Sequence, residues 1–271
     1  MNRRLISLTL VLLLLPAAAA ADFAAGMSAY RSGGFEAAVA EWRPLAEQGD
    51  ANSQEMIGFM YLYGQGVSRG DSIAIKWYRR AAEQGHAGAQ NSLGTLYENG
   101  RGTLKDYATA ADWYRRAAEQ NHAEAKNNLG RAYLEGRGVD RDDKEALRLF
   151  TEAATDGLGL SMINLGRMYE QGRQVRVNYG QATTWYVRAA KAGQAARARD
   201  RLVAVARRGS RAAFTWLRDA ANAGDGDAMH KLGLLYFEGV GILQNFTLAH
   251  LWVNLSAALG NERAAQDREV I

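Results

Sequence analysis

The chain has 271 residues, of which 48% are hydrophobic, a formal net charge of +4 and no cysteine. The absence of cysteine excludes a disulfide framework and any metal site built on thiolates, so packing must stabilise the fold. The 33 basic and 29 acidic residues nearly balance, which is not the strongly basic composition typical of a nucleic-acid-binding domain. The chain also begins with the pattern of a secretory signal peptide, and we expect no nucleic-acid partner for an exported protein.

Residues 1–21 have the pattern of a secretory signal peptide. Arg3 and Arg4 provide a positive start, the apolar run 5–16 is too short to span a membrane, and small residues at 19–21 offer a cleavage site. The alternative is an uncleaved membrane anchor. The pattern predicts an exported protein, periplasmic or secreted, with no stable membrane insertion after cleavage. The mature chain would keep 31 basic and 29 acidic residues, a net charge of +2.

The chain repeats itself with a period of 36 residues. Gly58, Gly94, Gly130 and Gly166 are 36 residues apart, and Gly233 has the same sequence around it; we call these five the anchor glycines. After each one, a tyrosine follows at the third position, a second glycine at the sixth, an alanine at the sixteenth and a tryptophan or leucine at the nineteenth. Such a period is typical of stacked supersecondary units.

Each repeat predicts two helices joined by a loop. The first helix, A, contains the anchor glycine and ends at a Gly-x-Gly sequence, because glycine accepts the left-handed conformation of a helix end. The second helix, B, is predicted to begin at an Asp or Asn whose side chain accepts hydrogen bonds from free backbone amides, namely Asp106, Asp142, Asn178 and Asn245. We expect large side chains such as Trp113 to fill the space between units.

The pattern Leu-Gly-x-x-Tyr-x-x-Gly-x-Gly, followed by Asp, Ala and Trp-Tyr-x-x-Ala-Ala, resembles the Sel1-like repeat, which is related to the tetratricopeptide repeat. The resemblance covers almost the whole mature chain and implies an all-α fold, a right-handed α-α solenoid of helix pairs over residues 22–260. It places the units at about 23–49, 50–85, 86–121, 122–157, 158–193, 194–224 and 225–260.

Three segments depart from the regular pattern. Gln174 replaces the loop glycine of one repeat, which predicts a locally different turn there. Residues 194–224 form a degenerate unit that lacks the Leu-Gly-x-x-Tyr core of helix A. Residues 261–271 begin another helix A, with Arg268 at a position where a core leucine is expected. This stub is interpreted as a polar C-terminal cap, the alternative being a truncated array.

The sequence contains no recognisable catalytic or metal-binding constellation. It has no Gly-x-Ser-x-Gly, no phosphate-binding loop and no His-Glu-x-x-His, and its four histidines do not cluster with carboxylates. One branch of the Sel1-like family is associated with β-lactam binding and hydrolysis, but that branch is cysteine-rich, and this chain also lacks a Ser-x-x-Lys pair. We predict no enzymatic activity, no catalytic residues, no metal and no cofactor.

Three positions of helix A lie outside the repeated framework: three before, one after and four after the anchor glycine. They share one face of the helix because they are spaced at i, i+4 and i+7. By resemblance to tetratricopeptide arrays, this stripe lines a concave groove that holds a protein partner. The residues predicted to line it are Phe59, Leu62, Asn91, Thr95, Asn127, Arg131, Arg167, Leu234 and Phe237. The alternative is that these positions vary because solvent imposes no constraint on them.

A second candidate surface is basic. Arginines crowd the degenerate unit, with only Asp200 and Asp219 among them, and two pairs are spaced to repel each other at i and i+4 on a helix. The residues of this predicted basic patch are Arg197, Arg201, Arg207, Arg208 and Arg211. It would suit an acidic protein, an anionic polysaccharide or a lipid head group. The alternative is a solvated face of a decayed repeat.

Together these features predict a non-catalytic scaffold or adaptor that binds a protein of the cell envelope, with a role in envelope signalling or polysaccharide export. Two alternatives remain: a secreted factor that binds a host protein, and an enzyme active on the cell wall or on β-lactams. The sequence does not specify an oligomeric state.

Overall fold

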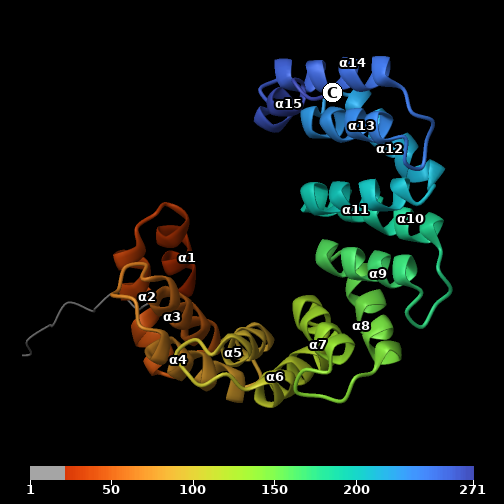
Figure 1. The fold of residues 1–271 in the computed structure, drawn as a ribbon. Helices are drawn as coiled ribbons and strands as arrows, with labels where there is room; N and C mark the ends of the chain where they lie inside the picture. The colour runs from red at the N-terminus through yellow and green to blue at the C-terminus, as the bar shows by residue number, and fades with distance from the viewer. Residues whose placement is uncertain (1–21) are drawn as a thin grey trace, which may run out of the picture. The chain divides into compact units, whose positions relative to one another are not determined.

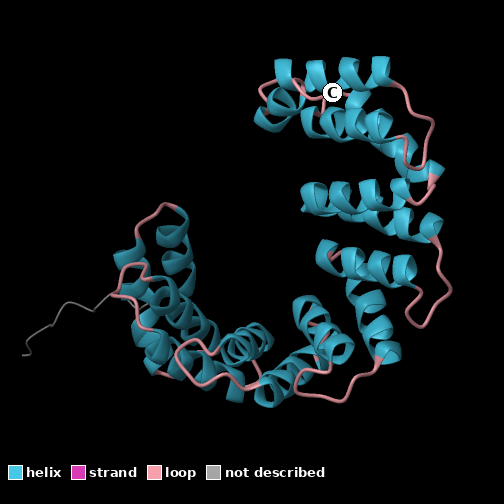
Figure 2. Cartoon of the chain, in the orientation of Figure 1, coloured by secondary structure: helices cyan, strands magenta, loops and turns pink. Residues whose placement is uncertain are grey.

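The computed structural model describes residues 22–271, so the predicted signal peptide lies outside the described residues. The described part of the chain consists of helices and loops, without a strand (Figure 2). It divides into a first unit that ends at Arg80 and a second unit that runs from Ala81 to Ile271. The prediction of an all-α solenoid of repeated helix pairs is confirmed.

The first unit contains α1 (Phe23–Arg31), α2 (Phe35–Glu47), α3 (Ala51–Tyr63) and most of α4 (Asp71–Glu83). Its core is built around Trp42, which is fully buried and donates a hydrogen bond from Nε1 to the Phe23 carbonyl at 3.2 Å. Gly26 lies directly against this ring, since a Cβ atom there would be 2.3 Å from Trp42 Nε1. The opening unit therefore keeps the repeat's principle of a glycine packed against an aromatic side chain.

The second unit stacks helix pairs from the end of α4 to the C-terminus (Figure 1). Its A helices are α5 (Ala87–Asn99), α7 (Ala123–Glu135), α9 (Gly159–Gln171), α11 (Ala195–Arg207) and α13 (Gly226–Glu238). Its B helices are α6 (Tyr107–Glu119), α8 (Asp143–Thr155), α10 (Tyr179–Ala189), α12 (Arg211–Asn222) and α14 (Phe246–Ala258). Each A helix packs against the B helix that follows it, and each B helix packs against the next A helix.

The predicted helix ends are confirmed. Asp106, Asp142, Asn178 and Asn245 cap the N-termini of α6, α8, α10 and α14, and each side chain accepts a hydrogen bond from a first-turn amide. The A helices α5, α7, α9 and α13 each end at a glycine in the left-handed conformation. Local sequence therefore fixes where each helix begins and ends.

The second glycine of the loop permits a close backbone contact. Gly138 has φ +73°, and a Cβ atom there would lie 2.0 Å from the carbonyl oxygen of Tyr107 at the start of α6. The loop thus lies so close to the preceding B helix that a Cβ atom at position 138 would clash with its backbone. Gln174 occupies the equivalent place in the next repeat and has φ +55°. The expectation that its turn differs is wrong, because glutamine accepts the left-handed conformation there.

The core places the repeated aromatic residues differently from the prediction. Tyr114, Phe150 and Tyr186, one position after the expected tryptophan or leucine, are at most 2% exposed. Each packs on an anchor glycine, so that a Cβ atom on Gly94 would lie 2.7 Å from the Tyr114 ring. Trp113 is only partly buried, with the Arg116 guanidinium 4.6 Å from its ring centroid. Large side chains therefore do fill the core, but the fully buried ones are Tyr114, Phe150 and Tyr186, whereas Trp113 lies at its edge.

The degenerate unit and the C-terminus close the array. Between α10 and α11 the long loop is replaced by a wide helical turn, η1 (Ala190–Gln194), which is broken at Gly193 with φ +83°. At the C-terminus, the short helix α15 (Glu262–Asp267) packs on α14 through the buried Ala264, while Arg268 is exposed. Asp267 Oδ2 lies 2.7 Å from His230 Nε2 on α13, which ties the stub to the last A helix.

Candidate functional site

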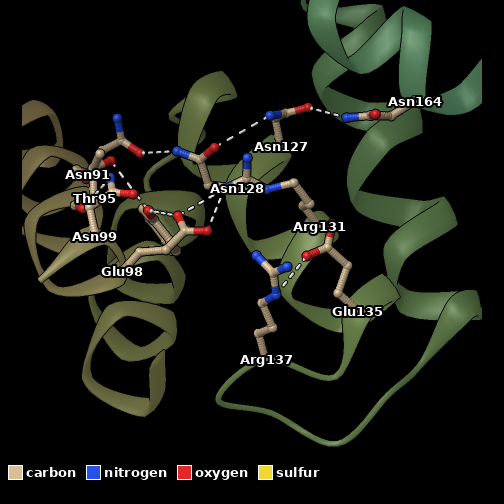
Figure 3. Close-up of polar contacts among 11 residues, drawn as sticks. Asn91, Thr95, Glu98, Asn99, Asn127, Asn128, Arg131, Glu135, Arg137 and Asn164 are labelled. Carbon is tan, nitrogen blue, oxygen red and sulfur yellow. Dashed lines mark hydrogen bonds and ion pairs between the residues drawn. The ribbon is translucent and has the colours of Figure 1, made fainter. Parts of the chain in front are cut away.

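Asparagines link three successive A helices of the second unit. Asn128 on α7 donates from Nδ2 to Asn91 Oδ1 on α5 at 3.0 Å, and Asn164 on α9 donates to Asn127 Oδ1 on α7 at 2.9 Å. A longer contact of 3.4 Å, from Asn127 Nδ2 to Asn128 Oδ1, joins the two steps. Figure 3 shows the resulting row of amides across the three helices, which we call the asparagine ladder. Every step uses positions two and three before an anchor glycine.

The ladder fixes the spacing of the A helices and leaves hydrogen-bonding capacity at its ends. Asn127 is 6% exposed and its Oδ1 also accepts from Ser161 Oγ at 3.1 Å, so this residue is structural. Among the described residues, Asn91 Nδ2 and Asn164 Oδ1 have no hydrogen-bond partner. Both side chains are half-buried. These end amides can therefore bind an external donor or acceptor, such as a peptide backbone.

A charged cluster stands beside the ladder on the same helices (Figure 3). Arg131 Nη2 lies 2.7 and 2.8 Å from the two carboxylate oxygens of Glu98 on the previous A helix. Tyr114 donates its hydroxyl to Glu98 Oε2 at 2.7 Å. Burial and the neighbouring carboxylate raise the pKa of Tyr114 above its ordinary value. The phenol stays protonated at neutral pH and acts as a fixed hydrogen-bond donor.

The same device recurs two repeats later. Tyr186 donates to Glu170 Oε2 at 2.7 Å, and Glu170 is 5% exposed. Burial, followed by the hydrogen bond to the carboxylate, raises the pKa of Tyr186. Arg201 Nη1 lies 3.8 Å from Glu170 Oε2 and supplies a positive charge. In the intervening repeat the carboxylate and the phenol are replaced by Leu134 and Phe150, so that pair is apolar.

The structure distinguishes among the nine predicted groove residues. In the first unit, Phe59 is half-buried against Tyr30 and Tyr63, and Leu62 is 7% exposed. The expectation of a solvent-facing side chain is therefore wrong for Leu62, as it is for Asn127 in the second unit. Asn127 is buried because it bonds to Ser161 and Asn164 of the next A helix, whereas Asn91, at the same repeat position, is half-buried.

The other predicted groove residues of the second unit remain accessible. Asn91, Thr95 and Arg131 are half-buried on α5 and α7, and Arg167 is exposed on α9. Thr95 donates its hydroxyl to the backbone carbonyl of Asn91 at 3.1 Å. On α13, Leu234 and Phe237 are half-buried, and the Phe237 ring meets that of Phe246 edge-on at 5.7 Å. The A helices therefore present a mixed polar and apolar surface, which we call the A-helix face.

Two of the five arginines of the predicted basic patch have carboxylate partners. Arg207 binds Glu238 with Nε 2.8 Å from Oε2, and Arg201 lies near Glu170. Arg208 donates to the Tyr179 hydroxyl at 3.3 Å, and Arg197 donates to Gln194 Oε1 at 3.4 Å. Arg211 is exposed.

Acidic residues distant in sequence oppose this patch. Arg199 is 8% exposed and is paired with Asp225 and with Asp227, the latter at 2.9 Å. The expectation that only Asp200 and Asp219 oppose the arginines is therefore wrong. So is the expected repulsion of Arg207 and Arg211 on one helix, since Arg207 ends α11 and Arg211 begins α12.

Among residues 22–271, no three His, Cys, Asp or Glu side chains converge in a way that could hold a metal ion. Over the same range, no helix combines the length and the apolar character that crossing a bilayer requires.

Comparison with known proteins identifies the repeats. Residues 51–86, 87–122, 123–158, 159–194, 207–225 and 226–261 match the Sel1 repeat. The chain belongs to the Sel1 repeat family. The matched boundaries place one repeat at each A–B pair from α3 onward, with the degenerate unit matched only over its second part. No curated protein matches the sequence.

Two solved Sel1 repeat structures are similar in sequence as well as in fold. A Sel1 repeat protein from Oxalobacter formigenes is 31% identical with a TM-score of 0.68, over 88% of this chain and 97% of that one. The protein c5321, a protective antigen present in uropathogenic Escherichia coli strains, is also 31% identical with a TM-score of 0.71, over 91% of this chain. This chain spans 55% of the length of c5321.

Sequence reasoning missed the asparagine ladder and the Glu–Tyr pairs. Both leave a periodic signal. Asparagines that bond across repeats stand 37 residues apart, and a glutamate four positions after an anchor glycine accompanies a tyrosine twenty positions after it. Comparing pairs of repeat positions, rather than single positions, would have found them.

Proposed function

We propose that this Sel1 repeat protein is a non-catalytic scaffold that binds a protein partner on the A-helix face of its second unit. The observation that carries the proposal is the set of accessible amides and guanidiniums on consecutive A helices. Asn91 and Asn164 end the asparagine ladder with unused hydrogen-bonding groups, and Arg167 is exposed beside them. Membership of the Sel1 repeat family supports it, because stacked helical repeats commonly present extended binding surfaces.

The proposed setting is the cell envelope. Residues 1–21 have the sequence pattern of a signal peptide, which supports export to the periplasm or secretion. The proposed role is regulation of envelope signalling or polysaccharide export through the bound partner. A fusion of residues 1–21 to a reporter that is active only outside the cytoplasm tests export, and a silent reporter would overturn it.

A second candidate is a secreted factor that acts on a host protein. The likeness to c5321, a protective antigen, supports this candidate, although the chain spans only 55% of that protein's length. Detection of the mature protein in culture medium rather than in the periplasm would favour it. The alternative from another class is an enzyme active on β-lactams. Incubating the purified protein with a chromogenic β-lactam tests it, and we expect no hydrolysis.

The scaffold proposal is tested by blocking one face at a time. Asn99 is exposed at the end of α5, on the A-helix face, and Thr184 is exposed on α10, a B helix. Asn99→Trp and Thr184→Trp add the same bulk to the two faces. In cells treated with a crosslinker, we expect wild type and Thr184→Trp to capture the same protein and Asn99→Trp to lose it. Equal capture by both variants would contradict the proposal.

A further inference from the structure

Five arginines surround one cavity on the A-helix face. The cavity lies between α7 and α9 and the loops that follow them, and it has a volume of about 410 Å³. Its basic lining consists of Arg131, Arg137, Arg141, Arg167 and Arg173, whereas Glu135 is its one acidic lining residue. Leu134 and Met168 add an apolar lining. We call this cavity the arginine pocket.

Three of these guanidiniums already have carboxylate partners. Arg131 binds Glu98 through both oxygens, Arg137 Nε lies 2.9 Å from Glu135 Oε2, and Arg141 Nε lies 2.8 Å from Asp143 Oδ1. Asp143 has its pKa held below the ordinary value chiefly by the hydrogen bond from Arg141, with a smaller effect of Arg173. These pairs hold their arginines in place around the cavity.

Arg167 and Arg173 have no carboxylate within ion-pair distance among residues 22–271. For Arg167 the repeat pattern explains why. Arg131 and Arg167 occupy the same repeat position, one after an anchor glycine. Arg131 pairs with Glu98, which stands four positions after the anchor glycine of the preceding repeat. In the repeat before Arg167 that position is Leu134.

The chain therefore has no glutamate at position 134 to pair with Arg167. Tyr114 donates a hydrogen bond to Glu98, and Tyr186 donates one to Glu170. Leu134 instead packs against the apolar cluster that contains Phe150, which has no hydroxyl to donate. Leu134 and Phe150 replace the glutamate and the tyrosine together, because a glutamate beside phenylalanine would lack the hydrogen bond that a tyrosine hydroxyl donates. The result is an arginine aimed at a space that an external carboxylate can fill.

We propose that the arginine pocket binds an acidic segment of the protein partner, with a carboxylate of that segment lying beside Arg167 as Glu98 lies beside Arg131. Guanidiniums bind carboxylates through paired hydrogen bonds, which favours this ligand class. The apolar lining from Leu134 and Met168 selects a segment in which acidic and apolar side chains alternate. The half-buried amide of Asn164, also in the lining, can bind the backbone of the segment. This inference rests on the proposed function and specifies the partner's chemistry.

Leu134 offers a matched pair of variants. Leu134→Glu supplies the missing carboxylate from within the chain and fills the space, whereas Leu134→Gln has the same size and loses the same apolar contact without the charge. Both variants are expected to fold, because position 134 is only half-buried and the equivalent residue of the preceding repeat is Glu98. Circular dichroism melting of the purified full chain checks this expectation.

The probe is a fluorescein-labelled hexapeptide of sequence ELEELE, with QLQQLQ as the neutral control, followed by fluorescence anisotropy. We expect Leu134→Gln to bind ELEELE somewhat more weakly than wild type, because it loses an apolar contact. We expect Leu134→Glu to bind it at least about tenfold more weakly than Leu134→Gln, because only the glutamate adds a competing carboxylate. Binding should weaken as salt is raised, since the attraction is between charges. Equal binding of ELEELE by the two variants, or equal binding of both peptides by wild type, would overturn the proposal.

Pyrophosphate distinguishes an acidic segment from a phosphate ligand. If pyrophosphate bound in a Leu134→Glu-sensitive manner and ELEELE did not bind up to about 1 mM, the pocket would be a phosphate site and the proposal would be wrong. Failure here is separable from failure of the scaffold itself. The capture experiment with Asn99→Trp does not involve the arginine pocket, and it would still report a partner on the A-helix face.

Discussion

Replacing Gly138 by alanine tests the packing of the loops against the preceding helix. The residue has φ +73°, and a Cβ atom would lie 2.0 Å from the carbonyl oxygen and 2.2 Å from the carbonyl carbon of Tyr107. These are backbone atoms, so no side chain can rotate out of the way. The left-handed conformation costs alanine about 1–2 kcal/mol, and the displaced loop adds roughly 1–3 kcal/mol. We expect Gly138→Ala to lower the free energy of unfolding by about 2–5 kcal/mol.

Gly157 provides the matched control within the same repeat. It has φ +94°, but a Cβ atom there would meet nothing within 4 Å. Gly157→Ala should therefore cost only the conformational penalty of about 1–2 kcal/mol. Urea unfolding of the purified variants, followed by the helix signal in far-ultraviolet circular dichroism, measures both free energies. Equal destabilisation would show that the loop does not lie against α6, and would refute the steric argument.

Three further predictions concern the same framework. Gln174→Gly should stabilise the protein by up to about 1 kcal/mol in urea unfolding, because glycine relieves the left-handed strain at φ +55°; a loss of stability would contradict this. Tyr186→Phe should lower the free energy of unfolding by about 1–3 kcal/mol, because the buried Glu170 loses its closest hydrogen-bond donor. Tyr114→Phe should lower it less, because Glu98 keeps its two contacts with Arg131. The reverse order would be inconsistent with the structure. Folding raises the pKa of both tyrosines, so their contribution to the free energy of unfolding should be fully present below about pH 10 and be lost above it. The double Phe variant should therefore lose less stability between about pH 10 and 11 than wild type. Equal losses in the two proteins would refute the burial of the phenols.

The repeat, the caps and the turns could be predicted because short-range sequence controls them. Glycine ends a helix and Asp or Asn begins one for reasons that lie within a few residues. The period of 36 residues then extended one repeat to the rest of the chain. Even Gln174 follows the turn of its neighbours.

The contacts across repeats could not be derived in that way. Whether Trp113 or Tyr114 enters the core depends on which ring meets Gly94, and that depends on how far each helix rotates in its pair. Helical spacing placed Leu62 on the same face as Phe59 but did not show that it is buried. Sequence neighbours do not show which carboxylates oppose the arginines of the degenerate unit, because those that bind Arg199 come from the next unit.

The candidate site was predicted in part. Arg131 and Arg167, which the stripe groups together, both line one cavity. It did not reveal that Arg131 is paired and Arg167 is not, because that difference arises from Glu98 and Leu134 one repeat earlier. Pairing between repeats, rather than residue type, decides which charge is available.

Photo-crosslinking in cells tests the central claim most directly. A photoreactive amino acid would be placed at Asn99 or Arg167 on the A helices, and at Thr184 on a B helix as the control, since all three side chains are exposed. The structure predicts that one protein is captured from both A-helix positions and not from Thr184. Capture of that protein from Thr184 alone, or to the same extent from all three positions, would contradict binding on the A-helix face.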